Sequence, residues 1–215
     1  MKKAVIKGEL PDIEAVECMS AGMQMTTPLT TCDLIVLSTD PSINNPVIAE
    51  SIVDLKLDSL SCLTTVHAFK TTIKAKNDMS GIHRTNEIRQ WYIGIARKYK
   101  GSPVLFVSEN ITNKPLFASD DSGIGKIRGI ARSLSLVSRA NDVMIEFSHA
   151  YGFDVKLIDT SQATSTKAHR LMLIQSKFKN FKELFGVKLN QDVADSVYRG
   201  VVEIDRIKLN RRMKK

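Results

Sequence analysis

The stretch "DLIVLSTDPSINNPVIAESIV" (Asp33 to Val53) determines how the fold begins. Its opening, "DLIVLSTD", is a continuous apolar run with β-branched members and a polar end, which is typical of a strand buried on both faces. Prolines and asparagines then turn the chain, and "VIAESIVDLK" predicts a second strand. A charge at the end of a buried strand is costly unless it is paired, hydrogen-bonded or bound to a metal ion. Asp40 is therefore the first residue that needs an explanation.

Hydrophobic periodicity along the rest of the chain predicts an α/β fold. "SCLTTVHAFKTT" (Ser61 to Thr72) predicts a third strand, which completes a meander. Apolar residues at three- and four-residue steps predict helices, and short apolar runs predict strands. The expected elements are a helix over 84–99, a strand over 104–110, a helix over 124–151, a strand over 153–159 and further helices that end with 191–207.

Length and charge set limits on the kind of protein. The chain has 215 residues, 43% of them hydrophobic, which suits one well-filled domain better than two small ones. A formal net charge of +8, with a dense basic group in "RIKLNRRMKK" (Arg206 to Lys215), favours polyanionic partners. A soluble basic protein without such a partner remains the alternative.

Cysteine usage and hydropathy exclude several classes. The three cysteines stand at scattered spacings without a nearby histidine cluster, so we expect neither a disulfide framework nor a zinc site. Acids and a proline interrupt the basic N-terminus before a signal-peptide core appears, and no apolar run is long enough to span a bilayer. We therefore expect a reducing, cytoplasmic setting and no membrane partner.

Four acidic residues in separate elements are candidates for one site. Asp40 ends the first strand, and Glu109 ends the strand over 104–110. Because sites in open α/β sheets gather where strands end, we expect these two acids to converge. Asp192 and Asp195 stand three residues apart, on one face of the last helix. Grouped carboxylates repel one another unless divalent cations neutralise them, and hard oxygen ligands suit Mg²⁺ or Mn²⁺.

Such a site predicts a reaction. Two ions about 4 Å apart would activate a water molecule and stabilise the leaving oxygen in phosphodiester cleavage. A basic chain with an acidic site therefore indicates a nuclease.

Each acid also has a purely structural alternative. Asp40, directly before Pro41, suits the start of an Asx-type turn. Glu109 suits an exposed strand end that pairs with a lysine. Asp192 stands near a helix start, where its charge complements the helix macrodipole. The conjunction of the four acids favours the metal site over these separate roles.

Four motifs resemble, in order, those of the RuvC-like Holliday-junction resolvases. "IVLSTDPSINNPVIAESIV" is similar to the first hairpin of that family, with a metal-binding aspartate before the turn. "VLFVSEN" matches the strand that carries the family's glutamate, and "GIGKIRGIARSLSLVSRA" resembles the helix that follows. "QDVADSVYRGVV" resembles the closing helix, in which two acids stand three residues apart. The resemblance covers about residues 33 to 205.

The resemblance implies a fold and an activity. The fold would be RNase H-like, with a five-stranded mixed sheet of three antiparallel and then two parallel strands, flanked by helices. Asp40, Glu109, Asp192 and Asp195 would be catalytic and would hold Mg²⁺ or Mn²⁺, as two ions in one site. The activity would be a structure-specific endonuclease that resolves four-way DNA junctions in recombination and repair. A homodimer would cut two strands symmetrically and leave 5′-phosphate and 3′-hydroxyl ends.

The same resemblance implies a domain organisation. The nuclease domain would span 33–207, with a basic tail over 208–215. An N-terminal extension over 1–32 has no counterpart in the short bacterial enzymes, which favours a viral or otherwise divergent branch.

Basic and aromatic residues are assigned DNA contacts by the resemblance. Lys167 lies between the fifth strand and the closing helix, where the family has a basic residue close to the site, and would contact the scissile phosphate. Lys114, Lys126 and Arg128 follow the glutamate strand and would touch backbone phosphates. Phe117 is the nearest candidate for the family's aromatic wedge. The alternatives are ordinary surface charge for the basic residues and packing beneath its loop for Phe117.

Two other functions remain open. One is another nuclease of the same fold, such as a terminase-like or repair nuclease. The other is a non-catalytic nucleic-acid-binding protein that kept the fold. Loss of metal-dependent cleavage in Asp40→Asn or Glu109→Gln, with DNA binding intact, separates the enzyme from the binding protein.

Overall fold

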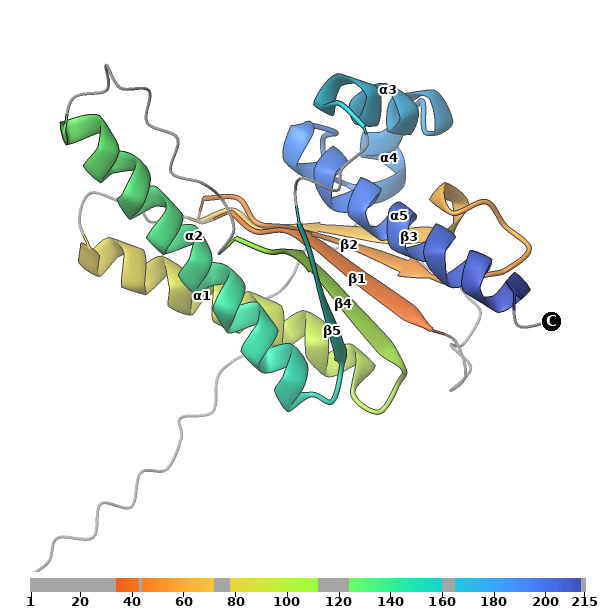
Figure 1. Ribbon diagram of the computed structural model, residues 1–215, viewed down its shortest axis with the longest axis horizontal. Coiled ribbons are helices and arrows are strands. Elements are labelled where there is room, and N and C mark those ends of the chain that lie inside the picture. Colours follow the sequence, from red (N-terminus) through yellow and green to blue (C-terminus); the bar gives the residue numbers. More distant parts are fainter. Residues whose placement is uncertain (1–33, 43, 72–77, 112–123, 160–164, 214–215) are drawn as a thin grey trace, which may run out of the picture.

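Five strands form one mixed sheet in the computed structural model, which describes residues 34–42, 44–71, 78–111, 124–159 and 165–213 (Figure 1). The strands are β1 (Ile35–Asp40), β2 (Val47–Ile52), β3 (Leu63–Ala68), β4 (Val104–Glu109) and β5 (Asp154–Ile158). Their order across the sheet is β3-β2-β1-β4-β5. β2 pairs antiparallel with both β1 and β3, whereas β4 runs parallel to β1 and β5 parallel to β4. The predicted meander and the predicted mixed sheet are confirmed.

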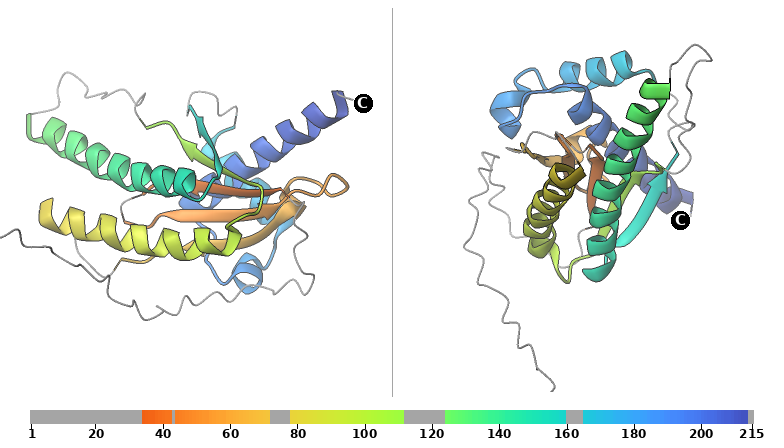
Figure 2. Two further views of the ribbon diagram at one scale, coloured as in Figure 1. Left: turned by 90° about the horizontal axis from the view of Figure 1, so that it is seen from below. Right: turned by 90° about the vertical axis from the view of Figure 1, so that its left-hand side faces the viewer.

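Helices cover both faces of this sheet (Figures 1 and 2). They are α1 (Asp78–Ala96), α2 (Ile124–Ala150), α3 (Lys167–Lys177), α4 (Phe181–Phe185) and α5 (Gln191–Met213), with the 3₁₀ turns η1 (Leu60–Cys62) and η2 (Arg97–Tyr99). α1 and α2 lie side by side on one face, while α3, α4 and α5 lie on the other. Of the helices in the described ranges, none is both long and apolar enough to cross a membrane.

Two helices are longer than the sequence predicted. α1 begins at Asp78, whereas the sequence placed its start near Arg84, because the regular three- and four-residue spacing of large apolar residues begins only at Ile88. α5 continues to Met213 rather than ending at Ile207, and its last residues are exposed, so no buried face marks them. Most of the expected basic tail is thus helical. The expected extension over 1–32 lies outside the described residues.

Each face of the sheet has its own apolar layer. On one face, α1 buries the stripe that its periodicity predicted, with Ile88, Tyr92 and Ile95 at most 2% exposed. On the other face, α5 buries Val193 and Val197 against the meander strands. The packing of the last helix against the sheet, expected from its apolar residues, is confirmed.

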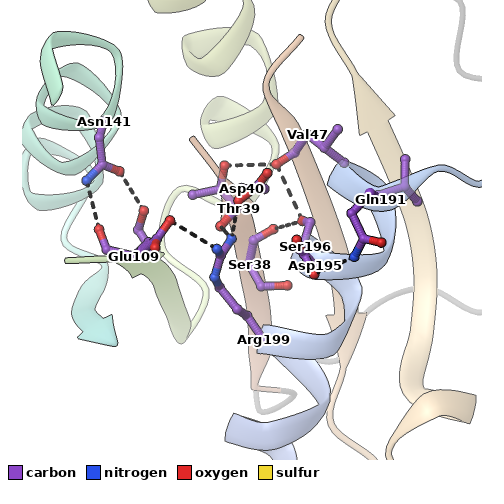
Figure 3. Close-up of polar contacts among 12 residues, drawn as sticks. Ser38, Thr39, Asp40, Val47, Glu109, Asn141, Gln191, Asp195, Ser196 and Arg199 are labelled. Carbon is purple, nitrogen blue, oxygen red and sulfur yellow. Dashed lines mark hydrogen bonds and ion pairs between the residues drawn. The ribbon is translucent and has the colours of Figure 1, made fainter. Parts of the chain in front are cut away.

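The backbone of α5 approaches β1 and β2 closely at two small residues. The hydroxyl of Ser196 donates to the backbone oxygen of Ser38 at 2.7 Å (Figure 3). The same hydroxyl accepts from the backbone N–H of Ala49 at 3.2 Å. One turn later, a Cβ at Gly200 would lie 2.6 Å from Ser38 Oγ. This contact fixes the height and rotation of α5 over the end of β1, where Asp40 stands.

Gly200→Ala is expected to lower the free energy of unfolding by about 1–3 kcal/mol, because the added methyl group meets Ser38 in a filled layer. The matched control is Gly94→Ala in α1, where nothing lies within 4 Å of the added carbon. That change should stabilise the protein by about 0.5–1 kcal/mol, since glycine weakens a helix interior. Denaturant unfolding of both variants measures the difference. A Gly200→Ala protein as stable as the wild type would contradict the close approach.

A buried acid away from the strand ends ties the meander to the end of α1. Glu50 in β2 lies 3.1 Å from Nε2 of His67 in β3, measured from Glu50 Oε2, and Thr64 Oγ1 lies 3.3 Å from Glu50 Oε1. Burial alone would raise the pKa of Glu50, but hydrogen bonds from His67 and Tyr99 outweigh it, and the pKa lies below its ordinary value. The ionised carboxylate is therefore favoured by the fold.

The lowered pKa of Glu50 predicts a pH dependence of stability. The ionised form contributes stability above the unfolded pKa, and this contribution is lost as the pH falls through the folded pKa, over roughly pH 5 to 3. Glu50→Gln should cost about 1–3 kcal/mol at pH 7 and flatten this part of the profile. Glu146→Gln, on the exposed side of α2, is the control. Unfolding free energies measured from pH 3 to 7 test the prediction, which fails if the wild-type and Glu50→Gln profiles are parallel.

Candidate active site

Asp40 and Glu109 stand at the same edge of the sheet. Asp40 is the last residue of β1, and Glu109 is the last residue of β4. The two strands are parallel neighbours, paired from Ile35 and Val104 to Ser38 and Val107, and extending this register by two residues places Asp40 opposite Glu109. The two acids that are 69 positions apart in the sequence therefore face one another across adjacent strand ends.

Among the described residues of the turn after β1, Ser42 and not Asp40 accepts the side-chain hydrogen bonds. The backbone N–H groups of Asn44 and Asn45 donate to Ser42 Oγ, at 3.3 Å each. The side chain of Asp40 is directed instead toward α5 (Figure 3). Glu109 is likewise buried, and is not an exposed strand end. In the described part of the chain, the geometry thus disfavours the purely structural alternatives for both acids.

Arg199 of α5 lies between these two carboxylates. Its Nη1 donates to Asp40 Oδ1 at 2.8 Å and to the backbone oxygen of Thr39 at 2.7 Å. Its Nη2 donates to Glu109 Oε2 at 3.2 Å (Figure 3). One guanidinium thus bridges the ends of β1 and β4 from the helix that covers them.

Asp195 brings a third carboxylate from α5 to this edge. It is buried, and its Oδ1 accepts from Arg170 Nη1 at 2.8 Å and from Gln191 Nε2 at 2.9 Å. The Arg170 guanidinium lies over the ring of Tyr198, 5.3 Å from its centroid. Asp195 is therefore held by one residue of α3 and one of α5.

Asp192 is less engaged than the other three acids. It lies in the first turn of α5 and is half-buried. Within the described ranges, its side chain has no hydrogen bond or ion pair. The structure therefore brings Asp40, Glu109 and Asp195 together, and Asp192 lies about one turn nearer the start of the same helix.

The local electrostatics leave the site short of positive charge. Burial is the largest influence on the pKa of Asp40, and it raises this pKa. The charge and hydrogen bond of Arg199 act in the opposite direction, and the charges of Glu109 and Asp195 add to the increase, so that the pKa of Asp40 lies above its ordinary value. An additional cation at this edge would stabilise the ionised carboxylates.

The donor set fits a hard divalent cation in its chemistry. Carboxylate oxygens suit Mg²⁺ or Mn²⁺, and those of Asp40, Glu109 and Asp195 act on one another at one edge of the sheet. Among the residues that the structure describes, no three acidic, histidine or cysteine side chains are spaced as a ready metal site. Arginines contact the acids instead: Arg199 lies between two of them, and Arg170 binds the third.

A buried amide supports the end of β4. Asn141 of α2 donates from Nδ2 to the backbone oxygen of Glu109 at 3.2 Å, and its Oδ1 accepts from Ser108 Oγ at 2.5 Å (Figure 3). Both contacts are buried. Asn141 therefore couples α2 to the strand end that carries the glutamate.

The residues expected to contact DNA are described by the structure to different extents. Lys167 is the first residue of α3 and is exposed. Lys114 and Phe117 lie outside the described residues. Lys126 and Arg128 belong to the first turns of α2, where the structure describes the backbone alone. Their DNA contacts stay predictions.

Two arginines at the site were missed by the sequence analysis. Arg199 follows Asp195 by four residues, which places both on one helix face, and this spacing was a usable signal. Arg170 follows Lys167 by three residues in α3, so the segment expected to supply a basic residue contains two. Arg170, and not Lys167, is the one that pairs with Asp195.

The strand order and the mixed strand directions define an α/β fold of the RNase H-like class. Among solved structures, the chain is similar to Thermus thermophilus RuvC, at 12% identity and a TM-score of 0.53, covering 82% of this chain and 96% of that one. For the T. thermophilus RuvC in complex with Holliday junction substrate, the identity is 14% and the TM-score is 0.52. This match covers 81% of this chain and 96% of that one. The predicted resemblance to RuvC is confirmed at the level of the fold.

A viral protein is a weaker structural match. The Fowlpox virus resolvase in complex with its substrate Holliday junction DNA has 16% identity and a TM-score of 0.42, covering 80% of this chain and 98% of that one. No protein-family model matches the chain, and no curated protein matches it in sequence.

Asn141→Ala is expected to lower the free energy of unfolding by about 1–3 kcal/mol, because it leaves the buried Ser108 hydroxyl and Glu109 carbonyl without this partner. Asp142→Ala changes the neighbouring exposed residue, and should stay within about 0.5 kcal/mol of the wild type. Thermal and denaturant unfolding compare the two. Equal stabilities for the two variants would show that the amide does not support the end of β4.

Proposed function

We propose that the protein is a metal-dependent endonuclease that cuts four-way DNA junctions. The observation that carries this proposal is the meeting of acids from β1, β4 and α5 at one edge of an RNase H-like sheet. Three buried or half-buried carboxylates at one place are costly for stability and suit a cation-binding role. The similarity of fold to RuvC in complex with Holliday junction substrate favours the same substrate class. A net charge of +8 agrees with a polyanionic partner.

The acids and basic residues would have separate roles. Asp40, Glu109, Asp195 and Asp192 would hold one or two Mg²⁺ or Mn²⁺ ions. Such ions, when bound, activate a water molecule and stabilise charge on the leaving oxygen. The chain itself fixes the ligands: strand pairing sets Asp40 opposite Glu109, and the docking of α5 sets the height of the two helix acids.

Basic residues near the acids would position the DNA. Arg170 orients Asp195 and, with Lys167 at the exposed start of the same helix, would present positive charge to the phosphate backbone. Lys114, Lys126 and Arg128 would extend this contact, and Phe117 would serve as the wedge at the junction centre. These contacts fix the register of the substrate and not its sequence.

A homodimer suits the proposed substrate. A four-way junction has two-fold symmetry, and two identical sites related by a two-fold axis would cut it symmetrically. Each nick would leave a 5′-phosphate and a 3′-hydroxyl. Paired nicks on opposite strands are the expected product.

One observation favours a second function, a DNA-binding protein of this fold without catalysis. Arg199 supplies a permanent positive charge between Asp40 and Glu109. A protein that had lost its metal could use this arginine to keep two buried acids stable. The two functions differ in one measurable property, which is cleavage.

A cleavage panel separates the two functions. Labelled four-way, three-way, flap and linear duplex DNAs are incubated with the protein in Mg²⁺ or Mn²⁺. The four-way junction should be cut by symmetric paired nicks, and chelation of the metal should abolish cutting. Asp40→Asn and Glu109→Gln should reduce the rate by about 100-fold or more while junction binding is retained.

The control in this panel is Asp142→Asn, which removes one exposed acid from α2 and should leave the rate unchanged. A wild-type protein that binds junctions but cuts none of the DNAs in either metal would refute the nuclease and support the binding protein. Equal cutting of the flap and the four-way junction would keep the nuclease but overturn its substrate.

A further inference from the structure

The guanidinium of Arg199 contacts one oxygen atom on each of two carboxylates that a metal ion at this site would use. It contacts Oδ1 of Asp40 at 2.8 Å and Oε2 of Glu109 at 3.2 Å. The side chains of all three residues are largely enclosed, with exposed fractions of 12% for Arg199, 18% for Asp40 and 4% for Glu109. A divalent ion bound to these two carboxylates would lie close to the guanidinium, so the two positive charges would compete for one enclosed site.

Arg199 can leave these oxygens only by moving its side chain. Arginine is not deprotonated in proteins, so its charge stays. The backbone beneath it is fixed, because the neighbouring Ser196 hydroxyl and Gly200 dock α5 against β1. The long side chain, in contrast, has several rotatable bonds. Displacement is therefore a rotation of the guanidinium about an immobile helix.

The charge balance favours exchange of the arginine for a divalent ion. Asp40, Glu109 and Asp195 together face the charges of Arg170 and Arg199. Replacing one guanidinium by an ion of charge +2 adds a positive charge where three carboxylates meet. Hard carboxylate oxygens also suit a small divalent cation. The exchange becomes favourable when the displaced guanidinium finds another anionic partner.

We propose that Arg199 is the internal counter-ion of this site: it competes with the divalent metal for Asp40 and Glu109, and once displaced it contacts a backbone phosphate of the bound DNA. The proposal rests on the proposed function, since it concerns the same metal and the same substrate. A guanidinium that leaves its carboxylate loses an ion pair unless it finds a new anion. A phosphate can replace the carboxylate, because it accepts two hydrogen bonds from a guanidinium in the same geometry. Arg199 would thus couple metal binding to DNA binding.

Binding of Mn²⁺ to the DNA-free protein tests the competition without relying on cleavage. Free Mn²⁺ is followed by its electron paramagnetic resonance signal during titration. Arg199→Gln should bind Mn²⁺ roughly tenfold or more tightly than the wild type, because the competing charge is gone. The matched control is Arg206→Gln, which removes the same charge from an exposed position of α5 and should bind like the wild type.

A second variant guards against misfolding. If Arg199→Gln does not fold without metal, Arg199→Lys retains one charge but cannot bridge two carboxylates through a planar fork, and should bind Mn²⁺ more tightly than the wild type. Mn²⁺ should also raise the melting temperature of the Arg199 variants by more than that of the wild type. Equal or weaker Mn²⁺ binding by both folded variants would overturn the proposal.

Cleavage in a Mn²⁺ titration tests the phosphate contact. Arg199→Gln should reach half of its maximal rate at a lower Mn²⁺ concentration than the wild type, yet have a lower maximal rate, because the displaced guanidinium no longer contacts DNA. An unchanged maximal rate would overturn the phosphate contact.

The same measurements separate a failure of this inference from a failure of the proposed function. If Mn²⁺ binding is abolished by Asp40→Asn but is not tightened in the Arg199 variants, the metal site stands and the inference fails. If neither the wild type nor any Arg199 variant binds Mn²⁺ in an Asp40-dependent way, the proposed nuclease fails.

Discussion

The close docking of α5 on the first two strands is the constraint on which the site depends. Sheet pairing alone sets Asp40 opposite Glu109, but these acids face a third carboxylate only because α5 lies almost directly on β1. Ser196 and Gly200 make this possible, one by bonding the strand backbone and the other by having no side chain. A bulkier residue at either position would lift the helix and separate its acids from the strand ends.

The second constraint is electrostatic. Buried carboxylates are unfavourable in a core of this size, and a stable fold must compensate them. Here the compensation comes from Arg170 and Arg199, which hold Asp195 and the strand acids in the absence of any other cation. In the proposed metal site, the ion and the two arginines would compete for the same carboxylates.

Much of the fold could be predicted from the sequence. Its strands and helices bury apolar faces, and a buried face leaves an apolar run or a helical period in the sequence. The strand "DLIVLSTD" and the stripe that contains Tyr92 are examples. The convergence of acids at strand ends also follows from topology. The pairing of Arg170 and Arg199 with these acids depends on side-chain reach after docking, and the four-residue step from Asp195 to Arg199 alone does not say which acids the arginine contacts. The first turns of α1 were missed because the regular apolar spacing that marks this helix begins only at Ile88.

The site joins the first strand to the last helix, and this has a consequence for protein synthesis. Arg199 and Asp40 are 159 positions apart in the sequence. A nascent chain that has not yet been extended to α5 contains Asp40 and Glu109 but lacks Arg199 and the helix that covers the two acids. Because long-range contacts form late, the edge that carries Asp40 and Glu109 would be completed only after α5 has left the ribosome. A partly made chain would thus carry the two strand acids without the arginine that compensates them.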